Sequence, residues 1–354
     1  MPTLKDLRLV HIDLAPEILM LRHLVHLKLM HPYPSLTATL DLIAANPSLE
    51  TIVLRVKCGG QRDHRPAGAI TVPRLRVLKF EFYSPLPLFH HISIPRGASV
   101  FFSKWNDTGC EVALPDSLDH LRNAWEVKNL FVQRKYGHWI EANGPSGELK
   151  FEGVKDPLPE LLRLPLQFVE KFRYAEDDPS DGTANKELER DRIFKAFRGF
   201  SNLRTLVIGS CGLEVMKHIF RVLSPQTGRM VHGVSQNLLC PILSTVIVEA
   251  PRDGSWNQWV VPFLQMLHTR AAAGSRLKKV RIISCRGVQV PRPGEEKRRQ
   301  MAGFVPWVEV KYHRYEKDDE IDKRRARELF EWEYGQEGSL GDGLSVMDAK
   351  GDWE

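Results

Sequence analysis

The sequence contains no uninterrupted apolar run near the roughly 18 residues that a membrane-spanning helix needs. Its first residues, Met1 to Asp6, lack the basic-then-apolar pattern of a secretory signal. Cysteine is scarce: five cysteines are scattered along 354 residues, with no C-x-x-C pair and no nearby histidine pair at zinc spacing. These absences predict no membrane partner and no zinc site, and the dispersed thiols are typical of a cytoplasmic or nuclear protein.

Motifs of the common enzyme classes are missing too, because the chain has no G-x-S-x-G, H-E-x-x-H, P-loop or strand-following G-x-G-x-x-G. In a strand, adjacent His90 and His91 would point to opposite faces and share no metal. His218 follows Glu214 by one helical turn, and without a third partner this pair predicts a surface contact. Cys58 has no evident base beside it. We therefore predict no catalytic, cofactor-binding or metal-binding residue, and no enzyme.

The chain carries only a small excess of positive charge. The 50 Lys and Arg residues exceed the 44 Asp and Glu residues by 6, and 42% of the chain is hydrophobic, so a folded core is expected. Basic and aromatic residues gather at Lys297 to Arg299 and at Lys311 to Tyr315, a composition that can hold single-stranded nucleic acid. Acidic residues at Glu295, Glu296 and Glu316 to Glu320 would repel phosphates. Nucleic acid is therefore not the predicted partner, and an RNA-binding solenoid stays as the alternative.

What the sequence does have is a repeated pattern: an apolar residue, two variable positions, an apolar residue, one variable position and another apolar residue. The first copies are about 20 to 26 residues apart, within the leucine-rich-repeat range, and the later ones about 30 to 40. Copies begin at Leu4, Leu24, Leu49, Leu75, Leu203, Leu243 and Leu277, and weaker ones span Val127 to Val132, Val169 to Tyr174 and Val305 to Val310.

Segments with helical spacing of apolar residues separate these copies. They run from Leu36 to Ala44, from Ile193 to Phe200, from Leu213 to Leu223 and from Trp256 to Ala273. Strands that alternate with helices imply parallel strands joined by right-handed crossovers. The predicted fold class is α/β, an irregular, horseshoe-like leucine-rich-repeat solenoid with parallel strands on the concave face and helices on the convex face.

The pattern is least regular over residues 92–153, which we interpret as an insert of short strands around one helix near Asp116 to Ala124. Within it, Asn143 to Gly147 predicts a hairpin turn. The charged segment Ala175 to Lys186 is predicted to be an exposed, mobile loop. We assign residues 1–312 to the solenoid, 313–334 to a charged C-terminal helix that caps it, and 335–354 to a disordered tail.

Three short motifs accompany the repeats: Asn46-Pro47-Ser48-Leu49-Glu50, Ile94-Pro95-Arg96-Gly97-Ala98 and Gly144-Pro145-Ser146-Gly147. With the repeats, they resemble the fungal F-box and leucine-rich-repeat proteins from about residue 1 to 312. The resemblance implies an F-box that docks on the Skp1-type adaptor of a cullin ubiquitin ligase, while the repeats hold the substrate. Because the first copy begins at Leu4, Leu14 to Leu19 is predicted to be a loop and short turn. An adaptor is expected only if an F-box lies upstream.

Side chains alternate along a strand, so the residues that flank the middle apolar position of each copy are predicted to point outward. These are Asp6, Arg8, His26, Lys28, Thr51, Val53, Val77, Lys79, Thr205, Val207, Thr245, Ile247, Lys279 and Arg281. Such a preplaced row suits binding rather than turnover, and its cations and small aliphatic residues suit a protein with an acidic, partly apolar patch. We predict a protein-binding repeat scaffold, such as the substrate-recognition part of an SCF-type ubiquitin ligase. The remaining alternative is an enzyme whose site is assembled from distant residues.

Overall fold

The computed structural model describes residues 4–10, 14, 16–30, 36–55, 69–81, 86–103, 114–115, 117–134, 138–154, 156–176, 186–209, 211–224, 238–250, 256–285 and 295–313. The chain divides into two compact units, Met1–Tyr312 and His313–Glu354. The predicted C-terminal helix and tail therefore lie, from residue 314 onward, outside the described residues.

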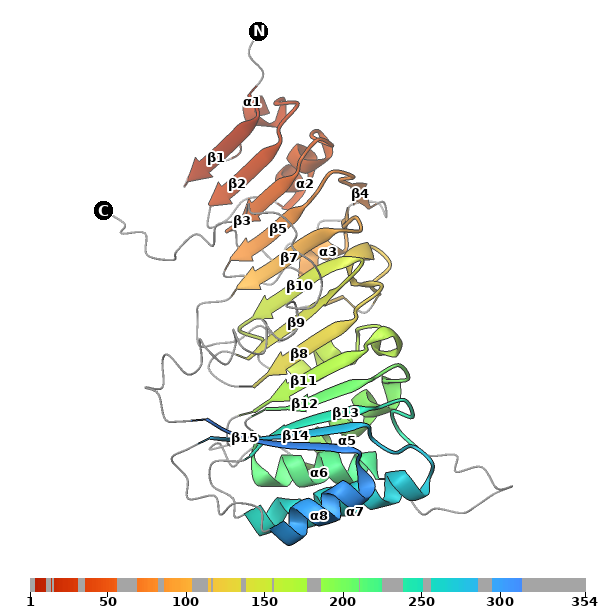
Figure 1. Ribbon diagram of the computed structural model, residues 1–354. Helices are drawn as coiled ribbons and strands as arrows, with labels where there is room; N and C mark the ends of the chain where they lie inside the picture. The colour runs from red at the N-terminus through yellow and green to blue at the C-terminus, as the bar shows by residue number, and fades with distance from the viewer. Residues whose placement is uncertain are drawn as a thin grey trace, which may run out of the picture. The chain divides into compact units, whose positions relative to one another are not determined.

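A large open sheet dominates the first unit (Figure 1). The strands are β1 (Asp6–Val10), β2 (His26–Met30), β3 (Thr51–Leu54), β4 (Ile70–Thr71), β5 (Val77–Glu81), β6 (Ile92–Ser93), β7 (Ala98–Ser103), β8 (Asn129–Gln133), β9 (Trp139–Gly144), β10 (Gly147–Glu152), β11 (Lys171–Ala175), β12 (Thr205–Ile208), β13 (Thr245–Glu249), β14 (Lys279–Cys285) and β15 (Trp307–His313). Thirteen of them follow the order β1-β2-β3-β5-β7-β10-β9-β8-β11-β12-β13-β14-β15, and β4 pairs with β6.

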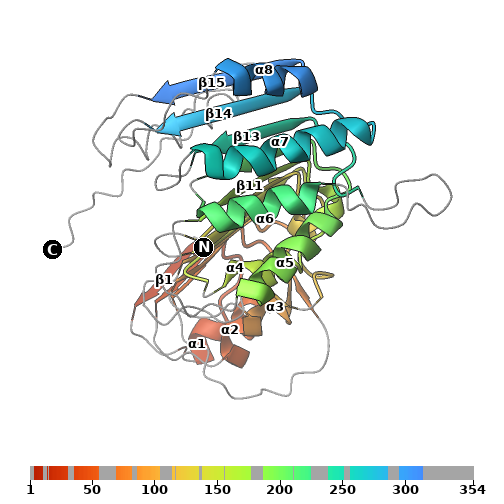
Figure 2. The same cartoon turned by 90° about the horizontal axis from the view of Figure 1, so that it is seen from below.

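Helices pack on one face of this sheet. They are α1 (Pro16–Leu19), α2 (Leu36–Ala44), α3 (Leu86–Phe89), α4 (Pro157–Leu161), α5 (Lys186–Gly199), α6 (Leu213–Leu223), α7 (Trp256–Ala272) and α8 (Glu295–Phe304), with the 3-10 helices η1 (Arg122–Ala124) and η2 (Leu166–Phe168). Figure 2 shows α5 to α8 side by side along that face. Between α6 and α7 the rings of Phe220 and Phe263 lie 4.9 Å apart. The four longer helices predicted from apolar spacing are confirmed as α2, α5, α6 and α7.

The repeat pattern explains why these strands form where they do. The first apolar position lies just before each strand and is at most 3% exposed at Leu24, Leu49, Leu75, Leu203, Leu243 and Leu277. The parallel register aligns the next two positions, so that Leu27 lies beside Ile52 and Leu206 beside Val246. All of these side chains belong to one apolar core between the sheet and the helices. The first apolar positions of the weaker copies, Val127, Val169 and Val305, are buried as well.

The prediction that strands and helices alternate strictly is wrong for the middle of the sheet. There β9 runs antiparallel to both β8 and β10, whereas the other strand pairs with a described register in the large sheet are parallel. The hairpin predicted around Asn143 to Gly147 is confirmed as β9 and β10, and it is inserted between β7 and β8. Gly147 is needed at its turn, because φ there is +131° and an added Cβ would lie 2.4 Å from the Ala98 carbonyl oxygen.

The helix predicted near Asp116 to Ala124 is also wrong, because over the described residues of that segment only the 3-10 helix η1 is present. Local side-chain bonds account for the difference. Ser117 Oγ accepts from the Asp119 backbone N–H at 3.2 Å and donates to Asp119 Oδ2 at 2.7 Å. Such bonds compete with the backbone bonds of a helix.

The Asn46 side chain links α2 to the start of β2. Its Oδ1 accepts from the Leu24 backbone N–H at 3.0 Å, and its Nδ2 donates to the carbonyls of Leu21 and Leu42. Asn46 is fully buried, so these bonds satisfy polar groups that water does not reach. None of the helices within the described ranges is long and apolar enough to cross a membrane.

Candidate binding face

The outward residues predicted from the repeats lie on the sheet face opposite the helices, here called the outer face. The charged and hydroxyl-bearing members are Asp6, Arg8, His26, Lys28, Thr51, Lys79, Thr205, Thr245, Lys279 and Arg281. In register, Arg8 lies beside Lys28, and Thr205 beside Thr245. The structure does not bring the whole set together, because five strands, β7, β10, β9, β8 and β11, separate β5 from β12.

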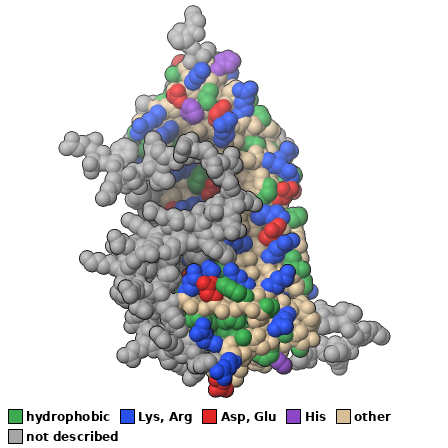
Figure 3. Space-filling model, in the orientation of Figure 1, with side chains coloured by type: hydrophobic (Ala, Val, Ile, Leu, Met, Phe, Trp, Pro, Cys, Tyr) green, Lys and Arg blue, Asp and Glu red, His purple; other side chains and the backbone are tan. Residues whose placement is uncertain are grey.

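These five strands supply outer-face residues that the prediction missed. Lys150 lies beside both Phe101 and Glu141, and Phe131 lies between Glu141 and Arg173 in the strand register. The weaker copies at Val127 and Val169 mark β8 and β11, so the same outward rule applied to them would have found Phe131 and Arg173. No repeat copy marks the hairpin residues. In Figure 3, basic, acidic and hydrophobic side chains are interspersed over the coloured part of this view.

Cations stack on aromatic rings in the middle of the outer face. The Arg173 guanidinium lies 4.7 Å from the centroid of the Phe131 ring, and Lys150 Nζ lies 5.3 Å from that of the Trp139 ring. The two rings meet edge to face, with centroids 5.7 Å apart. We call Phe131, Trp139, Lys150 and Arg173 the aromatic centre. Trp and Arg are among the side chains that most often anchor protein partners, and cations are attracted to the faces of aromatic rings.

A second stack of cations on an aromatic ring lies on β14 and β15, at one end of the sheet. Lys279 Nζ is 4.1 Å from the centroid of the Trp307 ring, which is 40% exposed, and Arg281 is 5.9 Å from it. Arg281 Nε also lies 2.7 Å from Glu309 Oε2. Glu309 thus holds Arg281 in position, as Glu249 holds Arg173 at 3.7 Å.

Positive charge is crowded on β11. Burial, and then the neighbouring Arg173, lower the pKa of Lys171 to about 8. On β14, burial followed by Arg281 likewise lowers the pKa of Lys279. Burial raises the pKa of Glu141, although Lys150 opposes this shift. Like charges held this close favour an anionic group beside them.

Two predicted contact residues, Val207 and Ile247, are corrected by the structure. They point to the outer face but are 1% and 2% exposed, and with Ile283 they form an apolar cluster separate from the main core. The strand pattern fixes only the direction of a side chain, whereas its exposure depends on what packs over it. Val207 and Ile247 are therefore not part of the candidate binding face.

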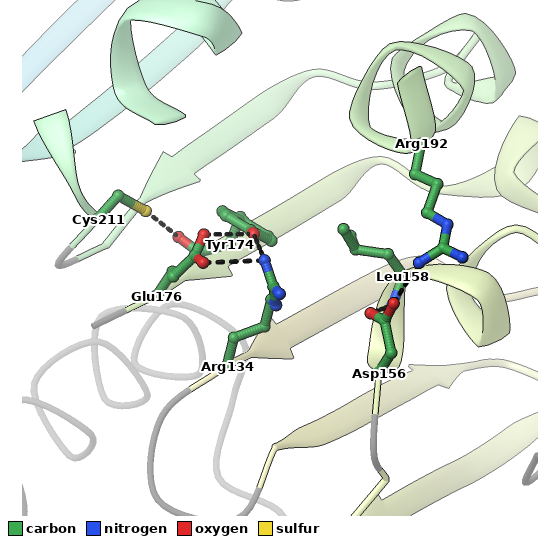
Figure 4. A network of polar contacts seen from close by, with 7 residues as sticks. All are labelled: Arg134, Asp156, Leu158, Tyr174, Glu176, Arg192 and Cys211. Carbon is green, nitrogen blue, oxygen red and sulfur yellow. Dashed lines mark hydrogen bonds and ion pairs between the residues drawn. The ribbon is translucent and has the colours of Figure 1, made fainter. Parts of the chain in front are cut away.

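A buried polar network lies at the carboxyl ends of β8 and β11 (Figure 4). Tyr174 Oη donates to Glu176 Oε2 at 2.7 Å, and Arg134 Nη1 donates to Glu176 Oε1 at 2.9 Å. Burial raises the pKa of Glu176 above that of an exposed glutamate, while Arg134 opposes the shift. Glu176 is only 3% exposed, so the predicted exposed loop is wrong at this residue, and residues 177–185 lie outside the described ones.

Other candidate chemistry does not assemble into a site. Glu214 accepts from Lys217 at 2.7 Å, and His218 Nε2 lies 3.1 Å from the Arg190 carbonyl oxygen. His90 and His91 form a turn after α3, and Cys58 lies outside the described residues. Over the described ranges, no group of three or more His, Cys, Asp and Glu residues is placed to hold a metal ion.

Comparison of the chain with protein-family models, with curated proteins and with solved structures found no match.

Proposed function

We propose that the chain is a protein-binding scaffold, a leucine-rich-repeat-type solenoid whose ligand lies across the outer face. One observation carries this proposal: among the described residues, helices cover a single face of a mostly parallel sheet, and the other face carries cations and aromatic rings in register. Parallel sheets are usually covered on both faces. A bound protein would supply the second layer.

The side chains on this face indicate what the ligand offers. On the outer face, one row of residues in register across the strands contains Lys28 on β2 and Lys79 on β5. The same row reaches Lys150 on β10, which belongs to the aromatic centre. Cations suit an acidic partner, and the rings of Phe131 and Trp139 suit apolar side chains between the acidic ones. We propose an acidic, partly apolar polypeptide as the ligand. Holding the substrate of an SCF-type ubiquitin ligase is one role that such a scaffold would serve.

The test uses a displayed library of 12-residue peptides selected against the full chain. Selected peptides should be rich in Asp and Glu with interspersed Leu, Phe or Trp, and should bind at least about tenfold more weakly to K28E/K79E/K150E. The matched control, R198E/R221E/R298E, changes the net charge equally at exposed positions on α5, α6 and α8. Peptides that bind both variants as tightly as the unaltered chain would reject the outer face.

RNA binding is the second candidate, favoured by the Lys279, Arg281 and Trp307 stack. A fluorescent 20-nucleotide oligouridylate titrated at increasing salt separates the two. If the oligouridylate binds more tightly than any selected peptide, with an affinity that falls steeply with salt, RNA replaces protein as the ligand class.

A further inference from the structure

The first copy of the repeat is less covered than the others. Leu4 is 48% exposed, whereas its equivalents Leu24 and Leu49 are fully buried. Leu7 is only partly buried, although its equivalent Leu27 is 1% exposed. Val10, the last residue of β1, is 39% exposed, and Met20, just after α1, is 74% exposed. The apolar core is therefore open at the β1 end of the sheet.

The backbone of β1 is open on the same side. β1 ends the sheet order, and over the described residues only β2 pairs with it (Figure 1). The Lys5 carbonyl accepts from the backbone N–H groups of Val25 and His26. Because bonding direction alternates along a strand, Leu7 and Leu9 also face β2, while Asp6, Arg8 and Val10 direct their N–H and C=O groups to the open edge.

The two charged residues of this edge, Asp6 and Arg8, flank Leu7, so they can pair with the same two residues of a second copy. In an antiparallel pair of two β1 strands, edge-facing residues lie opposite edge-facing residues. A register centred on Leu9 would set Arg8 opposite Val10 and leave Asp6 without a partner inside β1. A register that places Asp6 opposite Asp6, or Arg8 opposite Arg8, sets like charges together, which destabilises the pair. With Leu7 opposite Leu7, Asp6 of each copy lies opposite Arg8 of the other, so the pair forms twice, once on each side of the two-fold axis. The Asp6 side chain lies 3.8 Å from His26 Nε2 but is 75% exposed, so it can also reach an arginine across the edge.

We propose that β1 is a dimerisation edge, at which a second copy of this chain pairs antiparallel with Leu7 on the two-fold axis. The two sheets become continuous, with the partly buried Leu7 of each copy facing Leu7 of the other. The interface is isologous, so one patch completes both copies. It sets the less covered first repeat copy of each chain against that of the other, and it leaves the outer face open along the joined sheet.

A charge swap tests this interface directly. Sedimentation velocity on the full chain is compared for the unaltered protein, D6R, R8D and D6R/R8D. Each single change sets like charges opposite each other and should raise the dimer dissociation constant at least about tenfold, whereas the double swap restores opposite charges and should restore the dimer. The control D191R/K195D swaps an exposed ion pair on α5 and should leave the dimer intact. Circular dichroism confirms that each variant is folded.

Cysteine cross-linking fixes the register. Opposite residues in an antiparallel pair have Cα atoms about 4.5 to 5.5 Å apart, a separation that a disulfide spans. L7C should therefore form a covalent dimer under mild oxidation, and the matched variant L9C should not, because Leu9 lies opposite Lys5. A monomer at all concentrations up to about 100 µM, or a double swap that stays monomeric while folded, overturns the proposal. The peptide-binding variants leave β1 unchanged, so either proposal can fail alone.

Discussion

Tyr174 and Glu176, two residues apart at the end of β11, are joined by a buried hydrogen bond of 2.7 Å from the phenol hydroxyl to the carboxylate. Removing the hydroxyl in Y174F leaves Glu176 Oε2 without this donor while the ring stays in place. We expect the free energy of unfolding to fall by about 1 to 3 kcal/mol, measured by urea denaturation. The control S117A removes two exposed hydrogen bonds and should change the free energy of unfolding by less than about 0.5 kcal/mol. Equal effects of the two changes would contradict the assignment.

Removal of Arg134 should have a larger, pH-dependent effect. In R134M, the buried carboxylate of Glu176 loses its cation, and we expect a loss of roughly 3 to 5 kcal/mol near pH 8. Burial already raises the pKa of Glu176, and loss of Arg134 raises it further. The folded variant therefore binds a proton at a pH where unfolded glutamate does not, so its stability increases as the pH falls from 8 toward 5. A penalty that is the same at both pH values would show that Glu176 does not carry this effect.

The buried Asn46 carboxamide should be important for stability, because it serves three backbone groups. We expect N46A to lower the free energy of unfolding by roughly 2 to 4 kcal/mol, since the Leu24 N–H is left unsatisfied in the core. Asn129 provides the matched control. Its Nδ2 donates to Asn143 Oδ1 at an exposed position, and N129A should cost less than about 0.5 kcal/mol.

Two glycines with positive φ, Gly97 and Gly147, should differ in how much substitution by alanine destabilises the fold. At Gly147, a Cβ would lie 2.4 Å from the Ala98 carbonyl oxygen, whereas at Gly97, with φ of +81°, nothing lies within 4 Å. We expect G97A to cost about 1 to 2 kcal/mol from backbone strain alone. G147A should cost more than G97A, because the backbone of β7 must also move, and thermal unfolding of both variants measures the difference. A G147A chain as stable as G97A would contradict the close packing of β10 on β7.

Binding of the proposed acidic ligand should be linked to protonation of Lys171, whose pKa is about 8. An anion beside Lys171 raises this pKa, so the complex takes up as much as about half a proton at pH 8, and affinity falls as the pH rises above 8. Calorimetry of a selected peptide in buffers of different ionisation enthalpy measures the uptake. In K171R the guanidinium stays charged, and the uptake should disappear. If the uptake is unchanged in K171R, another group is responsible.

Local spacing was sufficient to predict most strands. The buried residues that precede β2, β3, β12 and β13 are the leucines that begin repeat copies, and α6 and α7 follow the predicted apolar spacing. Prediction failed where a contact between distant segments decides the outcome. Val207 and Ile247 were assigned to a ligand but are buried, and Glu176 was assigned to an exposed loop but pairs with Arg134, 42 residues away.

By itself, the sequence determined most of the strand segments and, in the repeat copies, which side chains point inward, because a strand's alternation and a leucine's preference for the core act over a few residues. Only the tertiary structure decided the order of strands in the middle of the sheet. The hairpin of β9 and β10 enters between β7 and β8, and that pairing places Trp139 beside Phe131 and Arg173 over Phe131. Pairing between distant strands depends on the packing of the whole core, which no local pattern records.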